Sequence, residues 1–206
     1  QVRMTLLYSM ALCTGLAVLG HADSAWSAQD VRPNILFIFT DDHPAHAMSC
    51  YGSKINHTPN LDRIAQGGIL FRNCFVTNSI CTPSRATILT GKYNHINGTY
   101  FIGQRFDGSQ QTFPKLLQQA GYQTAVVGKW HLGHGRGEFL PRAQGFTSFY
   151  GHYNGALDYF THVREGEVDW HRDEETVKEE GYTTDLLAAE AARFIEQSPA
   201  GGRVFL

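Results

Sequence analysis

The chain has 206 residues, of which 42% are hydrophobic and 12% aromatic, so it can bury the core of a globular domain and is neither disordered nor fibrous in composition. Its formal net charge of −2 provides no basic field of the kind that holds nucleic acid. We therefore expect no nucleic-acid partner.

The N-terminal segment is typical of a secretion signal. Arg3 precedes an apolar run at residues 6–19, and the small residues of GHADSAWSAQD follow it. The run is too short to span a bilayer comfortably, so no stable membrane insertion is expected. We interpret residues 1–28 as a signal peptide, cleaved between residues 22 and 28, which predicts export to a periplasmic, secreted or lysosome-like compartment. A buried N-terminal helix is the alternative.

Three cysteines remain after removal of the signal: Cys50, Cys74 and Cys81. An odd number in an oxidising compartment keeps at least one of them out of disulfide bonds. Cys50 and Cys74 either pair or stay as two free thiols, and spacing does not decide between these alternatives.

The first elements expected after the signal are a strand, a helix and a second strand. PNILFIFTDD is a short apolar run ending in Asp41 and Asp42, typical of a strand buried on both faces. TPNLDRIAQGG predicts a helix with Thr58 as N-cap and Gly67 as its stop. GILFRNCFVT is the second strand candidate.

A helix and then a helix–strand unit follow. In CTPSRATILTG, Thr82 can cap a helix, Pro83 suits its first turn and Gly91 suits a left-handed stop. TFPKLLQQAG predicts a helix ending at Gly121, and the next strand is expected at residues 122–127, with Lys129 and His131 just beyond it.

The last part of the chain is expected to be irregular before it becomes helical. Residues 133–160 are rich in glycine and aromatics, and HRDEETVKEEG is most simply a solvated surface. TTDLLAAEAARFIEQS predicts an amphipathic helix, and GGRVFL the opening of one more strand, which suggests a truncated domain. This alternation predicts an α/β fold with ligands at the carboxyl ends of parallel strands.

Several polar residues fall at those strand ends. Asp41 and Asp42 form a natural site for a hard cation, or else cap a turn. Cys81 begins a helix, where the dipole activates a nucleophile, unless it is an ordinary small buried residue. Lys129 and His131 could grip an anion and move a proton, although most such pairs are surface residues.

Residues 81–85, CTPSR, match the C-x-P-S-R pattern of the formylglycine-dependent sulfatases, and ATILTGK continues that family's pattern. The resemblance extends over PNILFIFTDD, HTPNLDRIAQGGILFRNCF, TFPKLLQQAGYQTAVVGKWHLG and GHYNGALDYFTH, so it covers nearly all of the chain after residue 32. It implies an alkaline-phosphatase-like fold with a central, mostly parallel sheet flanked by helices. Residues 29–206 would be the N-terminal part of that catalytic domain, truncated before the later strands.

The resemblance also implies a chemistry. Cys81 corresponds to the precursor of formylglycine, which a maturase makes and whose hydrated aldehyde carries the attacking hydroxyl. Asp41 and Asp42 match the first two ligands of one Ca²⁺ ion, which the modified Cys81 also contacts. The implied substrate is a sulfated small molecule or a sulfated carbohydrate.

Three further residues match catalytic positions of the family. Arg85 matches the residue that holds the formylglycine, Lys129 the lysine that grips sulfate, and His131 the base that helps to expel sulfate. The second metal-binding pair of the family and a later lysine and histidine are absent from these 206 residues. We therefore expect the isolated fragment to have an incomplete metal shell and no activity.

Other functions are compatible with parts of this pattern. The same fold also serves phosphate and phosphonate hydrolases. A zinc hydrolase could use His43 and His46 of DDHPAH, and a secreted binding protein could keep the scaffold without catalysis. Aromatic side chains could line a sugar or aryl pocket or simply be packed in the core: Tyr150, Tyr153, Tyr159 and Phe160.

Overall fold

The computed structural model describes residues 32–198 and 202–206. The chain divides into residues 1–31 and a unit of residues 32–206, and only the second is described. The signal peptide expected at residues 1–28 therefore lies outside the described residues. No helix in the described part of the chain has the length and apolar character needed to cross a membrane.

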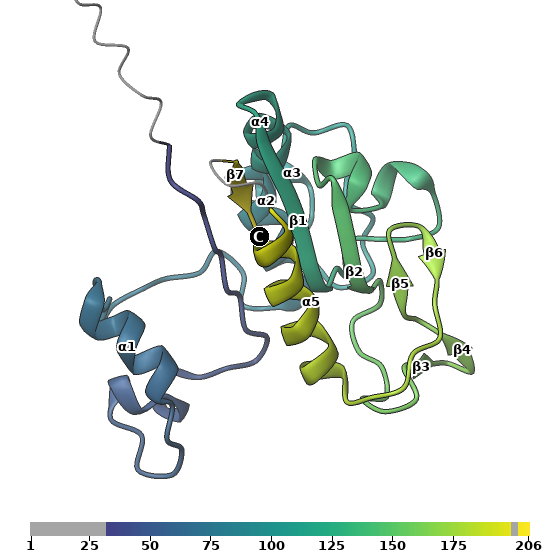
Figure 1. The fold of residues 1–206 in the computed structure, drawn as a ribbon. Coiled ribbons are helices and arrows are strands. Elements are labelled where there is room, and N and C mark those ends of the chain that lie inside the picture. The colour runs from purple at the N-terminus through teal and green to yellow at the C-terminus, as the bar shows by residue number, and fades with distance from the viewer. Residues whose placement is uncertain (1–31, 199–201) are drawn as a thin grey trace, which may run out of the picture. The chain divides into compact units, whose positions relative to one another are not determined.

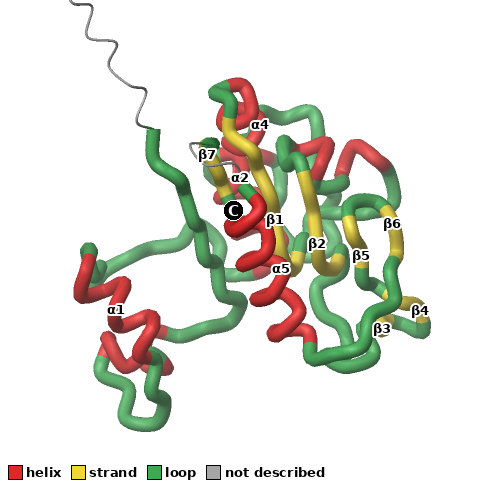
Figure 2. Tube along the Cα trace, viewed as in Figure 1, coloured by secondary structure: helices red, strands yellow, loops and turns green. Residues whose placement is uncertain are grey.

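Five strands form one mixed sheet, in the order β6-β5-β2-β1-β7 (Figures 1 and 2). The central strand β1 pairs in parallel with both of its neighbours, β2 and β7, whereas β5 and β6 extend the sheet as an antiparallel hairpin. The strands are β1 (Tyr122–Lys129), β2 (Ser148–His152), β5 (His171–Arg172), β6 (Glu175–Thr176) and β7 (Arg203–Phe205), with a separate pair of β3 (Val163–Arg164) and β4 (Glu167–Val168). The expected α/β fold is confirmed.

Helices cover both faces of this sheet (Figure 1). α5 (Thr183–Gln197) lies along one face, and α2 (Cys81–Thr90) and α4 (Phe113–Gln119) lie on the other. The remaining helical segments are α1 (Pro59–Gly67), α3 (Asn94–Asn97) and the 3₁₀ turns η1 (Ala45–Ala47), η2 (Ser49–Tyr51), η3 (Gly137–Phe139) and η4 (Arg142–Gln144). The helices predicted around α1, α2, α4 and α5 are therefore all present.

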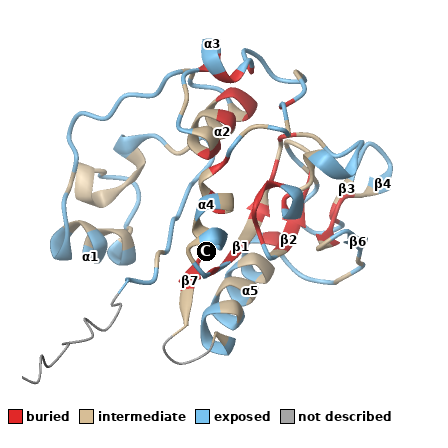
Figure 3. Cartoon of the chain, turned by 90° about the horizontal axis from the view of Figure 1, so that it is seen from above, coloured by how far each residue is buried: buried red, intermediate tan, exposed pale blue. Residues whose placement is uncertain are grey.

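The hydrophobic core lies between the sheet and the α2 side, where the buried residues gather in Figure 3. Ala86 and Leu89 of α2 face aromatic side chains that follow or belong to the strands. Phe146 meets Trp130 edge to face, with the ring centroids 6.0 Å apart. The core members are Ala86, Leu89, Phe106, Tyr122, Trp130, Leu132, Phe146, Phe149, Tyr153 and Phe205. This packing fixes α2 against the end of β1.

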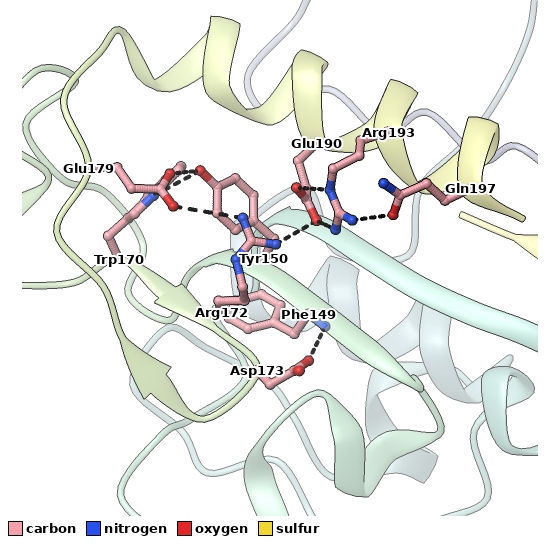
Figure 4. A network of polar contacts seen from close by, with 9 residues as sticks. All are labelled: Phe149, Tyr150, Trp170, Arg172, Asp173, Glu179, Glu190, Arg193 and Gln197. Carbon is pink, nitrogen blue, oxygen red and sulfur yellow. Dashed lines mark hydrogen bonds and ion pairs between the residues drawn. The ribbon is translucent and has the colours of Figure 1, made fainter.

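A polar network ties α5 to the sheet (Figure 4). Arg172 of β5 donates a hydrogen bond of 2.7 Å to Glu190 of α5, and its guanidinium lies over the Tyr150 ring, 4.4 Å from the centroid. Tyr150 of β2 donates to Glu179, and Arg193 pairs with Glu190. Because each charge in this partly exposed network has a partner, the network holds α5 against β2 and β5 without leaving a buried charge unpaired.

Three expectations about strands need correction. Residues 34–42 do not form the expected buried strand: Ile35 makes a single parallel bridge to Phe205, and Phe37 and Phe39 are 48% and 44% exposed. The segment pairs with β7 on one side only, so the described residues leave it half-covered. GILFRNCFVT forms no strand either, and Phe75 is 91% exposed.

The third correction concerns residues 133–160, which were expected to be irregular. They contain β2, a central strand of the sheet. Its sequence SFYGH shows no alternation of polar and apolar residues, because every residue except Ser148 is buried. The strand is recognised in the structure by its parallel pairing with β1.

Helix boundaries also differ from expectation. Ile80 is the N-cap of α2, so the cap predicted at Thr82 is wrong, and Thr82 is a buried residue of the first turn. The left-handed stop at Gly91 is confirmed, with φ at 65°.

Cys50, Cys74 and Cys81 are all free thiols in the structure.

Candidate active site

Cys81, Asp41 and Lys129 meet at one edge of the sheet. The Sγ of Cys81 lies 3.3 Å from the Nζ of Lys129 and 3.8 Å from the Oδ1 of Asp41. Lys129 also forms an ion pair with Asp41, and only 11% of its side chain is exposed. Residues 41, 81 and 129 are far apart in sequence, so the sheet and α2 bring them together as the strand-end argument predicts.

Arg85 fixes this cluster from α2. Its Nη1 donates to the backbone oxygen of Lys129 at 2.9 Å, and its Nη2 lies 3.8 Å from Asp41. The guanidinium is also 5.3 Å from the centroid of the Phe39 ring. Burial lowers the pKa of Arg85, and the charges of Asp41 and Cys81 oppose that shift. An arginine nevertheless stays charged, so it supplies a permanent cation at the site.

The two cations keep Asp41 ionised. Burial by itself raises the pKa of this carboxyl, but the hydrogen bond and charge of Lys129 and the charge of Arg85 outweigh it, and the net shift is downward. Cys81 is the first residue of α2, where unpaired N–H groups and the helix dipole favour negative charge. The site can therefore hold an anion between a helix N-terminus and two cations.

His131 lies beside the cluster in an unusual conformation. Its φ is +55°, a strained value for a residue other than glycine. Burial, together with the charges of Lys129 and Arg85, lowers the pKa of His131 to about 4. The imidazole is therefore neutral at neutral pH and able to accept a proton. Its Nδ1 is buried without a hydrogen-bond partner among the described residues.

Gly155 sets the position of that imidazole. A Cβ at residue 155 would lie 2.6 Å from Cε1 and 2.8 Å from Nε2 of His131, so alanine would displace the ring. We expect Gly155→Ala to lower kcat/KM of the full-length protein about 100-fold, because misplacing a catalytic group by about 1 Å has an effect of that order. Steady-state kinetics with a sulfate ester, the substrate class that the sequence resemblance implies, measures it.

The matched control for this substitution is Gly137→Ala, since a Cβ at residue 137 would meet no atom within 4 Å. It should keep wild-type turnover. Equal turnover of the two variants would contradict the positioning role of Gly155.

Asp42 does not join the cluster. It forms no hydrogen bond or ion pair within the described residues, and its φ is +47°. Those residues also contain no group of three or more His, Cys, Asp or Glu side chains placed to hold a metal, so His43 and His46 are not brought into a zinc-type site. Asp41 and Asp42 offer the oxygen donors that Ca²⁺ prefers, but two carboxylates fall short of its usual six to eight oxygens. The type of donor atom thus suits calcium, but these residues supply too few oxygens to complete its coordination shell.

His152 was missed by the sequence analysis. It ends β2, directly opposite Lys129 in the parallel register, and is only 8% exposed. Its sequence context gave no signal, because β2 itself was not recognised. Burial is the main cause that lowers the pKa of His152 to about 4; the charges of Lys129 and Arg85 add to the shift, while Asp169 and the backbone of Asn154 oppose it.

This buried neutral histidine predicts acid sensitivity. The unfolded chain binds a proton near the ordinary pKa of 6.5, whereas the folded protein resists protonation down to about pH 4, so stability is lost as the pH falls through that window. We expect His152 to contribute a loss of about 2 kcal/mol in unfolding free energy between pH 7 and pH 5. Urea unfolding of the wild type and of His152→Gln at both pH values measures it. An identical pH dependence in the two proteins would refute this prediction.

The four aromatic residues singled out in the sequence have different surroundings. Tyr153 lines a cavity beside His131 and stacks on Phe149 and on His171. Tyr150 packs against Trp170. Tyr159 and Phe160 are exposed and contact Tyr182. Of the four, only Tyr153 lines the cavity beside His131.

Comparison with known proteins places the geometry in context. Residues 33–206 match the family model described as Sulfatase. An N-acetylglucosamine-6-O-sulfatase of Bacteroides thetaiotaomicron is 47% identical over 167 residues, which cover 80% of this chain and 28% of that protein. The human N-acetylgalactosamine-6-sulfatase is 38% identical over 158 residues, covering 70% and 30%. The chain thus spans less than a third of the length of these relatives.

Solved structures agree on the fold. A protein crystallised in complex with its substrate D-glucosamine-2-N,6-O-disulfate has 44% identity and a TM-score of 0.73, over 84% of this chain and 33% of that one. The phosphonate monoester hydrolase of Agrobacterium radiobacter has 20% identity and a TM-score of 0.59, over 84% of this chain and 40% of that one, which shows a shared fold alone. The alkaline-phosphatase-like fold class predicted from the sequence is confirmed.

Proposed function

Because this chain belongs to the sulfatase family, we propose that the full-length protein hydrolyses a sulfate ester with formylglycine at residue 81 and one Ca²⁺ ion. The observation that carries the proposal is the meeting of Cys81, Asp41 and Lys129 at the N-terminus of α2. A helix end and two cations around one nucleophile position suit a substrate that is an anion.

The surroundings of Cys81 fit formylglycine. The oxygens of a hydrated aldehyde would replace Sγ, which already lies within reach of the ammonium of Lys129 and the carboxylate of Asp41. When formed, this group supplies the hydroxyl that attacks sulfur. A maturase that oxidises Cys81 is therefore a proposed partner, and export through the N-terminal signal is the proposed location.

Calcium fits the donors in kind. Asp41 and Asp42 would hold it together with the modified Cys81, and the remaining ligands would come from parts of the full-length protein outside these 206 residues. A bound divalent cation would supply further positive charge opposite the sulfate.

Three described residues would carry out the remaining steps: binding of sulfate, positioning of the site and proton transfer. Lys129 binds the sulfate oxygens and offsets the negative charge that grows in the transition state. Arg85 holds the end of β1 through the backbone oxygen of Lys129 and keeps α2 in register with it. His131, neutral and half-buried, accepts and returns a proton at its imidazole.

The substrate that we propose is a sulfated sugar. Two named relatives act on 6-sulfated amino sugars, and a solved relative holds a glucosamine disulfate. The cavity beside His131, lined by Tyr153 and Asn154, offers an aromatic face and an amide of the kind that binds sugars.

The test compares three substrates with the full-length protein expressed together with a maturase. An aryl sulfate should be turned over with a higher kcat/KM than the matched aryl phosphate or aryl phosphonate. Faster turnover of either phosphorus ester would replace the sulfatase proposal with a phosphatase or phosphonatase. No turnover of any ester would favour a binding protein.

A further inference from the structure

We infer that the cavity beside His131 recognises a second acidic group on the substrate, through Arg105 and Arg136. The inference rests on the proposed function, because it identifies which sulfated sugars the site prefers. It concerns selectivity and not the reacting sulfate, which Lys129 is proposed to bind.

The cavity lies next to the reaction centre. It has a volume of about 360 Å³, within the range of small-molecule sites, and His131 and Thr82, the neighbour of Cys81, both line it. Two buried polar atoms of these lining residues have no partner in the described residues: the Oγ1 of Thr82 and the Nδ1 of His131. Because buried polar atoms are normally hydrogen-bonded, a polar ligand is expected to satisfy them.

The lining is cationic. Arg105 and Arg136 both border the cavity, together with His134, and among its described lining residues there is no Asp or Glu. Arg105 forms no hydrogen bond or ion pair within the described residues. Arg136 pairs with Glu138 at 3.3 Å, but both side chains are more than half exposed, so that contact is weak and can be exchanged for a ligand. A guanidinium suits carboxylate and sulfate because its donors match two acceptor oxygens at once.

The neighbouring cavity limits where the acid group can lie. It shares His134, Tyr153 and Asn154 with the first cavity. Three further lining residues are acidic, Glu165, Glu167 and Asp169, against one arginine, Arg164, which already pairs with Glu165. Those carboxylates disfavour an acidic chain that extends in this direction. The preferred substrate is therefore a sugar whose second acid group lies close to the reacting sulfate, on the same ring or the adjoining one.

The experiment compares two compounds that differ at one substituent, N-acetylglucosamine 6-sulfate and D-glucosamine-2-N,6-O-disulfate. The full-length, matured wild type should prefer the disulfate, by kcat/KM for release of the 6-sulfate. Arg105→Gln should lower that preference at least tenfold with little change for the monosulfate, and Arg136→Gln should lower it about threefold. The preference should shrink as salt rises, because both arginines are exposed.

Arg142→Gln is the matched control, since Arg142 is a surface arginine paired with Glu174 and does not line this cavity. It should leave the preference unchanged. Good turnover of the monosulfate with no preference for the disulfate, or a preference that survives Arg105→Gln, would overturn the inference and leave the proposed function standing. No turnover of either compound, nor of an aryl sulfate, would instead refute the proposed function.

Discussion

Replacing Cys81 with alanine should abolish turnover by the full-length protein and leave its fold nearly unchanged. The side chain is only partly buried, and its contacts are two weak sulfur interactions, with Lys129 and Asp41. Losing them removes little packing, so the unfolding midpoint should stay close to that of the wild type. The proposed nucleophile is lost completely, because alanine has no group that a maturase can oxidise.

Two companion variants make this result specific. Cys81→Ser should be equally inactive in a host whose maturase modifies only cysteine, although serine keeps a hydroxyl at nearly the same place. Cys74→Ala is the matched control, because Cys74 is an exposed free thiol outside the site, and it should keep full activity. Loss of activity in Cys74→Ala as well would point to a general effect of thiol removal.

Mass spectrometry of the tryptic peptide containing residue 81 completes the test. Active wild-type protein should carry the mass of formylglycine or its hydrate there. An active sample in which that peptide retains the unmodified thiol would overturn the proposed role of Cys81.

Local sequence signals predicted the helices well. A proline in the first turn and a glycine at the end mark α2, and the amphipathic pattern of residues 183–197 marks α5. The cap of α2 was wrong by two residues because Thr82 is drawn into the core instead of facing the free N–H groups. The local sequence predicts that a helix forms, whereas tertiary packing helps to decide at which residue the helix begins and ends.

Strands were harder to predict because their partners are remote in sequence. β2 is five residues long and buried along most of its length, so no alternation of polar and apolar residues marks it. PNILFIFTDD shows the opposite failure: its apolar pattern is strong, but the described residues give it one partner strand only. A strong apolar pattern therefore did not determine how many partner strands, or how much burial, this segment has among the described residues.

The site was predictable to the extent that strand ends determine it. Asp41 and Lys129 meet because each lies at the end of an extended segment at one edge of the sheet. His152 was not predicted because its strand, β2, was not predicted. Gly155 was not predicted because a glycine has no side chain that would indicate a role in the site. The relation of such residues to the site can be recognised only when the structure shows which residues lie beside them.

Lys129→Met should lower kcat/KM for an aryl sulfate about 1,000-fold. The ammonium lies between Asp41 and the nucleophile position, is nearly buried, and thus acts where water screens charge poorly. Removing one such preorganised donor costs up to about 4 kcal/mol of transition-state stabilisation, which corresponds to a factor of this size. Stability should change little, because Asp41 is 37% exposed, can be hydrated, and still faces Arg85.

Two further substitutions serve as comparisons for Lys129→Met, one at the same position and one away from the cluster. Lys129→Arg keeps the charge but spreads it over a longer, planar group, so we expect it to regain some activity and to stay at least about tenfold below the wild type. Lys92→Met removes a partly buried lysine that binds Gln110 away from the cluster, and it should behave as the wild type. Because sulfate is charged before reaction and more so in the transition state, Lys129→Met should both raise KM and lower kcat. A kcat/KM within threefold of the Lys92→Met value would show that the cation at residue 129 does not act on the reacting group.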